Sequence, residues 1–245
     1  MAKPTSPMKR TGWAQPIYAQ AATKKERIGV IRWTYDGRAY RYSNAGEGLN
    51  PGKMSVAAQC DAAHIDEDIL VAVPVGTTQL TLTVTAGTAI AQGALEGGYF
   101  EINSGTGAGY RYAIAGNSAI DASGTTIYLD LDESIRVALD TTSTFNLIHS
   151  LWYSTTETST DENFATGVTP ITVTSGYYYW SQTHGPCTAL IKDTPAIGST
   201  LILGSTEGAV AVIATSVDVD VPIVGTITHL VGVSADYSSI FLQID

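Results

Sequence analysis

Apolar and polar residues alternate most clearly between residues 78 and 85, where every second position from 80 to 84 is leucine or valine. Leu80, Leu82 and Val84 would share one face of an extended strand, and the threonines between them would share the other. Similar runs predict further strands over 99–102, 110–114, 126–131 and 143–149, with glycine-rich turns at 103–109 and 116–124. Short strands at near-regular spacing favour a barrel or a sandwich over alternating strands and helices.

A second group of strand-sized apolar runs follows a polar, Ser/Thr-rich connection at residues 151–168. These runs lie at 171–174, 177–183, 189–191, 200–203, 210–215, 225–233 and 239–243. Glycines between the runs mark turns, and no long amphipathic helix is predicted in the chain. The pattern predicts an all-β protein in which an extended N-terminal arm, residues 1–65, is followed by two small β-barrel or β-sandwich regions, residues 66–150 and 151–245.

The first 65 residues are expected to form that arm because prolines at 4, 7, 16 and 51 exclude long regular elements. The alternating run over 28–42, interrupted by Asp36-Gly37, predicts a hairpin with a tight turn. Residues 55–64 predict a single helical turn. We expect the arm to become ordered against another surface.

Charge is distributed unevenly along the 245 residues, whose formal net charge is −10. Residues 1–53 contain ten basic and three acidic residues, a formal charge of +7, and the rest of the chain carries −17. Such a split is typical of a basic arm that binds an acidic protein surface or a phosphate-bearing partner. The alternative is a basic face that is only solvated. We favour a protein surface, because the acidic remainder would repel nucleic acid and no nucleic-acid-binding motif is present. The candidate contact residues of the arm are Lys9, Arg10, Trp13, Lys24, Lys25 and Arg27.

No catalytic motif is predicted. Gly105–Gly109 lacks the Gly-Lys-Ser/Thr ending of a phosphate loop, and Gly204–Gly208 does not have the spacing of a nucleophile elbow, so both are expected to be turns. The pairs Asp130/Asp132 and Asp218/Asp220 would each lie on one strand face, where cation binding or glycoside hydrolysis competes with simple solvation. We favour solvation, and we expect a protein that is not an enzyme and binds no cofactor.

The cysteines, histidines and apolar runs indicate no metal site, no membrane span and no secretory signal. Cys60 and Cys187 lie far apart and are expected to be reduced, with a disulfide as the alternative. The four histidines, at 64, 149, 184 and 229, have no metal-binding spacing. No apolar run is long enough to span a bilayer, and the first residues lack the apolar stretch of a secretory signal, so synthesis in a cytoplasm is expected.

The most individual segment is the aromatic run over 176–186, Gly-Tyr-Tyr-Tyr-Trp-Ser-Gln-Thr-His-Gly-Pro. Alternation sends Tyr177 and Tyr179 to one face of a strand and Tyr178 and Trp180 to the other. Aromatic residues on both faces indicate either a central strand between two packed layers or a strand that packs against a neighbouring subunit. Tyr178 and Trp180 are therefore both core and interface candidates.

This aromatic strand and its Gly-Pro turn, followed by Pro195–Gly198, Leu201, Gly208 and Ile223, are similar to a pattern in head decoration (cement) proteins of tailed bacteriophages. The resemblance extends upstream to residues 98–102, 109–114, 116–117 and 126–130, so it covers about residues 90–245. It implies a virion protein that binds the outer surface of the capsid, bridges major capsid protein subunits and commonly forms a homotrimer. From the charge distribution and the hydropathy pattern, we expect no direct contact with nucleic acid or membrane.

Two other functions remain open. A tail or baseplate adhesin would use exposed aromatic and acidic residues to bind host surface polysaccharide. A β-barrel glycosidase or lyase would use the paired acids, and the sequence supports it least.

Overall fold

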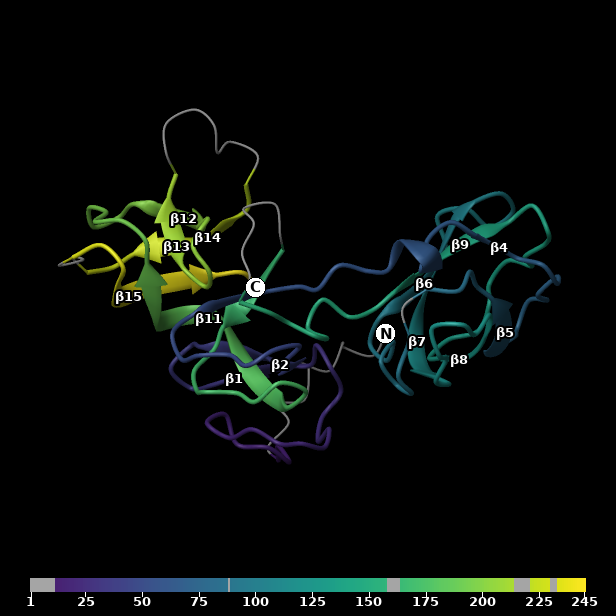
Figure 1. Cartoon of the computed structure of the whole chain (residues 1–245), viewed down its shortest axis with the longest axis horizontal. Helices are drawn as coiled ribbons and strands as arrows, with labels where there is room; N and C mark the ends of the chain where they lie inside the picture. Colours follow the sequence, from purple (N-terminus) through teal and green to yellow (C-terminus); the bar gives the residue numbers. More distant parts are fainter. Residues whose placement is uncertain (1–11, 88, 158–163, 214–220, 230–232) are drawn as a thin grey trace, which may run out of the picture.

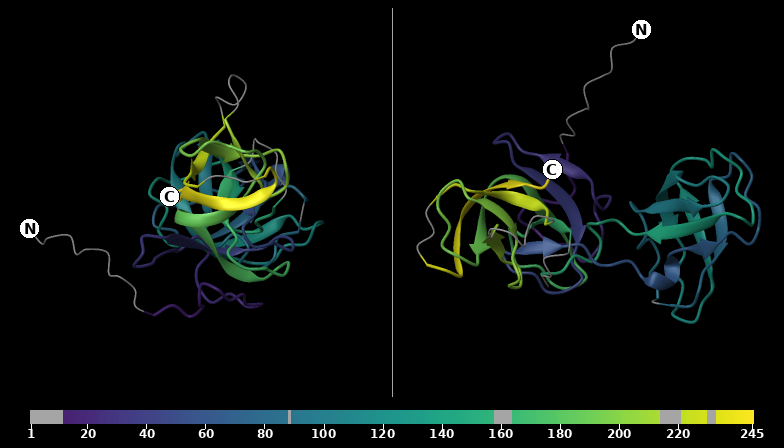
Figure 2. Two further views of the ribbon diagram at one scale, coloured as in Figure 1. Left: turned by 90° about the vertical axis from the view of Figure 1, so that its left-hand side faces the viewer. Right: turned by 90° about the horizontal axis from the view of Figure 1, so that it is seen from above.

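The architecture is described from a computed structural model, in which residues 12–87, 89–157, 164–213, 221–229 and 233–245 are described. The protein is all-β and forms two lobes with barrel-like sheets (Figure 1). Two chain segments, at about residues 57–66 and 149–155, connect the lobes (Figures 1 and 2). The single short 3₁₀ helix among the described residues, η1 (Ala62–His64), lies on the first of these connections.

The first lobe, on the right in Figure 1, is a six-stranded antiparallel sheet. Its strands follow the order β4-β9-β6-β7-β8-β5. Their bounds are β4 (Glu67–Asp68), β5 (Gln79–Thr83), β6 (Tyr99–Ser104), β7 (Arg111–Asn117), β8 (Thr126–Leu131) and β9 (Thr144–Ile148). Buried and exposed residues alternate along β5 and β8, and Leu80, Leu82 and Val84 lie together in the core as predicted. Alternation of this kind requires a sheet with one face in the core and the other in water.

The second lobe contains nine strands. They are β1 (Ile31–Trp33), β2 (Ala39–Asn44), β3 (Met54–Val56), β10 (Ala165–Val168), β11 (Tyr178–Ile191), β12 (Thr200–Leu203), β13 (Val210–Val212), β14 (Ile223–Ile227) and β15 (Asp236–Gln243). Pairing closes on itself around β11, β13, β12, β14 and β15, which makes a small barrel. Aliphatic side chains, among them Leu201 and Ile240, fill the barrel.

The long strand β11 belongs to two layers. Its second half pairs with β15, and its first half pairs with β2 and, at Gln182, with Val168 of β10. Tyr179 and Trp180 consequently have no exposed surface, and the run from 179 to 183 is buried on both faces. The first half of β11 is thus a central strand between packed layers.

The expected N-terminal arm differs from the structure over residues 31–56. The predicted hairpin is present as β1 and β2, with Gly37 at φ 83° in its turn. However, β2 pairs with β11 and β3 pairs with β10, so these strands are integral parts of the second lobe. Tyr40 and Tyr42 are fully buried there. The alternating pattern of this segment therefore reflects its packing in the second lobe and not a separate arm. Residues 1–11 lie outside the described residues.

Three expectations for the second lobe are also corrected. The runs 177–183 and 189–191 belong to one strand, β11, and the expected Gly-Pro turn between them is absent. Near that position the pairing of β11 with β2 shifts in register between Gln182 and His184, and Gly185 has φ 89°. The glycine allows the strand to continue through a bulge where another residue would be strained. The expected strand at 171–174 is only a bridge between Val173 and Leu49. The polar connection at 151–168 contains the buried side chains Thr155 and Glu157 and the strand β10.

Candidate binding surfaces

The predicted contact residue Trp13 lies against the predicted contact residue Trp180. Their ring centroids are 5.0 Å apart in an edge-to-face arrangement, and the indole Nε1 of Trp180 donates a hydrogen bond to the carbonyl oxygen of Gln15 at 3.0 Å. The guanidinium of Arg32 lies 5.5 Å from the Trp180 ring centroid. Trp13 and Trp180 therefore stabilise this chain's own interior, and Trp180 is a core residue.

Tyr178 is half-buried beside the same cluster. Its ring stacks parallel to that of Tyr42 at 6.0 Å, and its backbone exchanges hydrogen bonds with Ala21. The segment that contains Trp13 and Ala21 consequently covers the Trp180 face of β11. Stacked and edge-to-face aromatic pairs each add about 0.5–1.5 kcal/mol beyond the burial of their area.

The basic residues expected to bind an acidic partner are partly engaged within the chain. Lys24 forms an ion pair with Glu96, and Arg27 forms one with Asp132, so the basic segment contacts the acidic first lobe. Lys25 is exposed, and its backbone N–H donates to the Tyr42 hydroxyl at 3.0 Å. Lys9 and Arg10 lie outside the described residues.

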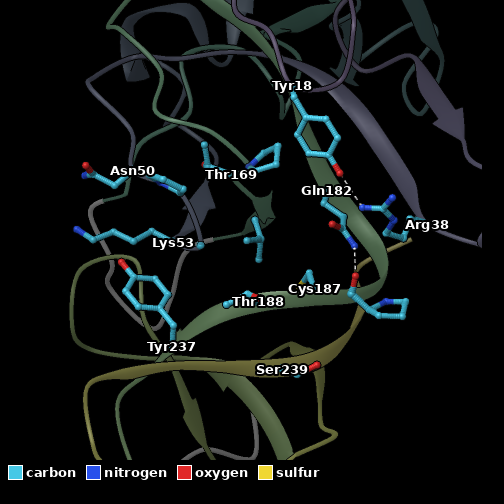
Figure 3. Close-up of a pocket in the computed structure, with 15 residues that line it drawn as sticks. Tyr18, Arg38, Asn50, Lys53, Thr169, Gln182, Cys187, Thr188, Tyr237 and Ser239 are labelled. Atoms are coloured by element: carbon cyan, nitrogen blue, oxygen red, sulfur yellow. Dashed lines mark hydrogen bonds between the residues drawn. The ribbon is translucent and has the colours of Figure 1, made fainter.

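A groove of about 950 Å³ lies in the second lobe, and Figure 3 shows the side chains that line it. Tyr18 from the N-terminal segment and Tyr237 from β15 line it, together with Arg38, Lys53 and Gln182. Tyr18 and Tyr237 are 61% and 51% exposed, so ring surface from each is available to a ligand. The remaining lining residues are small, polar or proline: Asn50, Pro51, Gly52, Val168, Thr169, Pro170, Pro186, Cys187, Thr188 and Ser239.

Hydrogen bonds hold the Tyr18 end of the groove. Arg38 donates from Nη1 to the Tyr18 hydroxyl at 3.0 Å and from Nε to Asp36 Oδ2 at 2.8 Å. The hydrogen bond from Arg38 lowers the pKa of Tyr18. Gln182 donates from Nε2 to the carbonyl oxygens of His184 and Pro186, which fixes its amide in the groove wall.

A buried carboxylate supports the opposite end. Glu157 is 1% exposed and accepts from Lys53 Nζ at 2.9 Å, while Glu207 lies 3.4 Å from the same nitrogen. The hydrogen bond to Glu157 raises the pKa of Lys53. Gly52, at φ 75°, lies so close to Tyr237 that an added Cβ would meet its ring at 2.7 Å. The Tyr237 ring therefore packs directly against the backbone at Gly52.

Aromatic faces next to amide, hydroxyl and guanidinium groups are suited to a sugar ring or an extended peptide. The sequence did not indicate this groove, because its residues come from segments near positions 18, 38, 50, 169, 182 and 237. No motif spacing connects such distant positions.

The other sequence candidates are placed as follows. Gly105–Gly109 and Gly204–Gly208 lie in the turns between β6 and β7 and between β12 and β13. Asp130 accepts a hydrogen bond from Gln79 at 2.8 Å, Asp132 pairs with Arg27, and Asp218 and Asp220 lie outside the described residues. Both cysteines are free thiols. Across the described ranges, no three His, Cys, Asp or Glu side chains form a potential metal site.

No family model, no curated protein and no solved structure matches this chain. In the part of the chain that the structure describes, no helix has the length and apolar character needed to cross a membrane.

Proposed function

We propose that the protein is a capsid decoration protein, which binds the outer surface of a tailed-phage head and bridges neighbouring major capsid protein subunits. The resemblance of residues 90–245 supports this role, and the observation that carries it is apolar surface exposed on both lobes. Leu70, Val71 and Val75 in the first lobe are 60%, 76% and 60% exposed. Trp33 and Tyr35 in the second lobe are 50% and 97% exposed.

The apolar residues of the first lobe lie on a loop with a defined shape. Ile69 and Val73 are buried, and their backbone N–H groups donate to Ser143 and Leu139 at 3.0 and 2.9 Å. These two backbone hydrogen bonds hold the loop in one conformation, in which the side chains of Leu70 and Val71 point outward. We define Leu70, Val71 and Val75 as the apolar loop. Exposed aliphatic groups clustered in this way are typical of a protein-binding surface.

Apolar surface on each of two joined lobes suits a bridging protein, because each lobe can bury its own contact. In the proposed role the protein adds to an assembled shell and stabilises it by mass action, since it binds the assembled state only. The particle would carry the protein on its outer surface as a homotrimer. The role is structural: it involves no catalysis, cofactor, nucleic acid or membrane.

Binding to phage heads that lack the protein tests this proposal. We expect the wild type to occupy the heads in hundreds of copies and to raise the temperature of heat-induced genome release. Val71→Asp should reduce occupancy at least tenfold, because a buried unpaired carboxylate costs more than the lost apolar contact. Thr81→Asp, a charge added at an exposed position of β5 outside the apolar loop, is the matched control. Equal release temperatures at full occupancy would contradict the proposal.

A second candidate function, polysaccharide binding by a tail or baseplate adhesin, is favoured by the groove between Tyr18 and Tyr237. A glycan panel and calorimetry of any hit test it, with Tyr237→Ala expected to weaken binding at least tenfold. Tyr128→Ala removes a tyrosine of similar exposure from the first lobe and is the control. A few copies per virion, located at the tail, would favour this candidate over the decoration role.

A further inference from the structure

Cys60 and His149 lie on the two segments that connect the lobes. Cys60 follows β3 and precedes η1 on the outgoing connection, and His149 directly follows β9 on the returning one. The two connections run between the lobes in Figures 1 and 2. Both side chains line the same cavity, and each influences the ionisation of the other. A cysteine and a histidine 89 positions apart in the sequence are thus brought together at the junction.

The hydrogen bonds of the imidazole favour its charged form. His149 Nδ1 lies 3.0 Å from the carbonyl oxygen of Ser150, and Nε2 lies 3.4 Å from that of Gln59, the residue before Cys60. Carbonyl oxygens only accept hydrogen bonds, so both ring nitrogens are placed to carry a proton. An imidazolium beside a thiol favours the thiolate.

The surrounding charges agree with this arrangement. Burial opposes ionisation of both groups, but the hydrogen bond and charge of His149 hold the pKa of Cys60 below its usual value. Burial lowers the pKa of His149, and the interactions with Cys60 and Ser150 outweigh it and raise that pKa to about 9. The opposing group is Glu101 on β6, whose negative charge raises the Cys60 pKa without reversing the balance.

A cavity of about 330 Å³ opens at the pair. Ile90, Leu95 and Leu147 form an apolar wall, and Asp61, His64 and Tyr153 supply the other ionisable side chains. The Tyr153 ring lies 5.9 Å from the imidazole, between ring centroids. The volume admits a small molecule and excludes a folded partner.

We propose that Cys60 and His149 form a thiolate–imidazolium pair that reacts with small disulfides entering this cavity. The Cys60 sulfur attacks one sulfur of the disulfide, a new S–S bond forms, and the other half leaves as a thiolate. His149 retains its proton, and no further oxidant is required because the disulfide itself is reduced. Cys60 is thereby assigned as a covalent modification site at the lobe junction.

The second cysteine is an internal control. Cys187 lies on β11 at the edge of the groove in Figure 3, and burial raises its pKa to about 12. Both cysteines are half-buried residues, but burial alone acts on the Cys187 thiol, whereas His149 also acts on Cys60. The proposal requires Cys60 to react through its thiolate at a pH where Cys187 remains protonated.

Thiol release from 5,5′-dithiobis(2-nitrobenzoate), measured on the full chain between pH 5 and 9, tests the proposal. In Cys187→Ser protein, the rate should have its midpoint below the usual thiol pKa of about 8.5. At pH 6 it should exceed the rate of Cys60→Ser protein, in which only Cys187 remains, at least tenfold. His149→Gln in the Cys187→Ser background should lower the rate at pH 6 at least tenfold and shift the midpoint upward.

A midpoint at or above that of an ordinary thiol in the Cys187→Ser protein would overturn the proposal, as would equal reactivity of the two cysteines at pH 6. These two measurements keep the native histidine, so they stand even where His149→Gln fails to fold. Circular dichroism of each variant identifies such a failure. Iodoacetamide, which alkylates thiolates without disulfide exchange, should react with the same dependence of rate on pH. A different pH dependence would show that the disulfide result comes from the reagent and not from the Cys60 thiolate, and would contradict the proposal.

Discussion

Both lobes bury one face of a β sheet, but they are built from differently arranged segments of the chain. The first lobe is made from residues 67–148 in one continuous stretch, and its strands bury alternate residues. The second lobe combines strands from 31–56 with strands from 165–243, and its central strand β11 is buried on both faces over residues 179–183. The comparison shows that apolar patterning indicates a strand but not the chain segments with which it pairs.

This difference has an energetic origin. Pairing β2 with β11 joins residues such as Tyr42 and Trp180 across more than a hundred positions, and the whole first lobe lies between them. Closure of a long loop costs conformational entropy that must be offset by the contacts it permits. The aromatic cluster of Tyr40, Tyr42 and Trp180, covered by Trp13, supplies those contacts.

Separating the lobes should have the largest effect. A fragment of residues 61–150 should fold cooperatively, because all six of its strands and its core are retained. A fragment of residues 151–245 should fail to fold, because β11 loses β2 and Tyr179 and Trp180 lose their covering layers. Circular dichroism and two-dimensional NMR distinguish these outcomes. Residues 12–57 joined to 149–245 by a flexible linker should restore the second lobe; a folded 151–245 fragment would show that β1–β3 are dispensable.

Trp180→Ala should destabilise the second lobe alone. Loss of a fully buried indole and its hydrogen bond to Gln15 costs about 3–5 kcal/mol of unfolding free energy. Urea unfolding followed by NMR, with resonances of each lobe resolved, should show a shift for the second lobe and none for the first. Tyr128→Ala, at an exposed position, is the control. Equal shifts in both lobes would indicate that they unfold as one unit.

Asp245→Asn should have a smaller, pH-dependent effect in the second lobe. Arg41 donates from Nε to Asp245 Oδ2 at 2.9 Å and from Nη2 to Oδ1 at 2.6 Å. Burial raises the pKa of Asp245, but these bonds outweigh it and lower the pKa in the folded protein. A carboxylate with a lowered folded pKa stabilises fully above its unfolded pKa of about 3.9, and the contribution disappears as the pH falls through the folded pKa. The variant should cost about 0.5–1 kcal/mol at pH 7 in a partly exposed pair.

Thermal unfolding of wild type and Asp245→Asn at pH 7 and at pH 2.5 checks the sign. The difference between the two proteins should shrink at the lower pH. A difference that grows on acidification would contradict the assigned ion pair.

Removing the ion pairs between the N-terminal segment and the first lobe should have the smallest effect on stability. Lys24→Gln and Arg27→Gln together should cost less than about 1 kcal/mol, because exposed pairs contribute only a few tenths each. Their effect should decrease further with salt, since screening acts on exposed charges. Small-angle scattering should instead show a wider range of lobe orientations than in Lys25→Gln, whose lysine has the same charge and is exposed. Identical scattering would indicate that other contacts orient the lobes.

The continuation of β11 through Gly185-Pro186 shows a limit of local patterns. Glycine and proline in succession usually mark a turn. Here β15 pairs with β11 from His184 to Ile191 and keeps it extended, and Gly185 adopts the left-handed backbone conformation that the irregularity needs. Pairing with β15 therefore keeps Gly185-Pro186 inside one strand, although the sequence at this position predicts a turn.

The sequence by itself determined the all-β class, the positions of most strands of the first lobe and the β1–β2 hairpin, because strand alternation and turn residues act between near neighbours. Only the tertiary structure decided that residues 31–56 join the second lobe and that Trp13 covers Trp180. It also decided that Tyr18, Arg38 and Tyr237 line one groove and that Cys60 meets His149. Each of these depends on bringing together segments far apart in the chain. Their relative position is set by the packing of whole sheets, and no local spacing of residues encodes it.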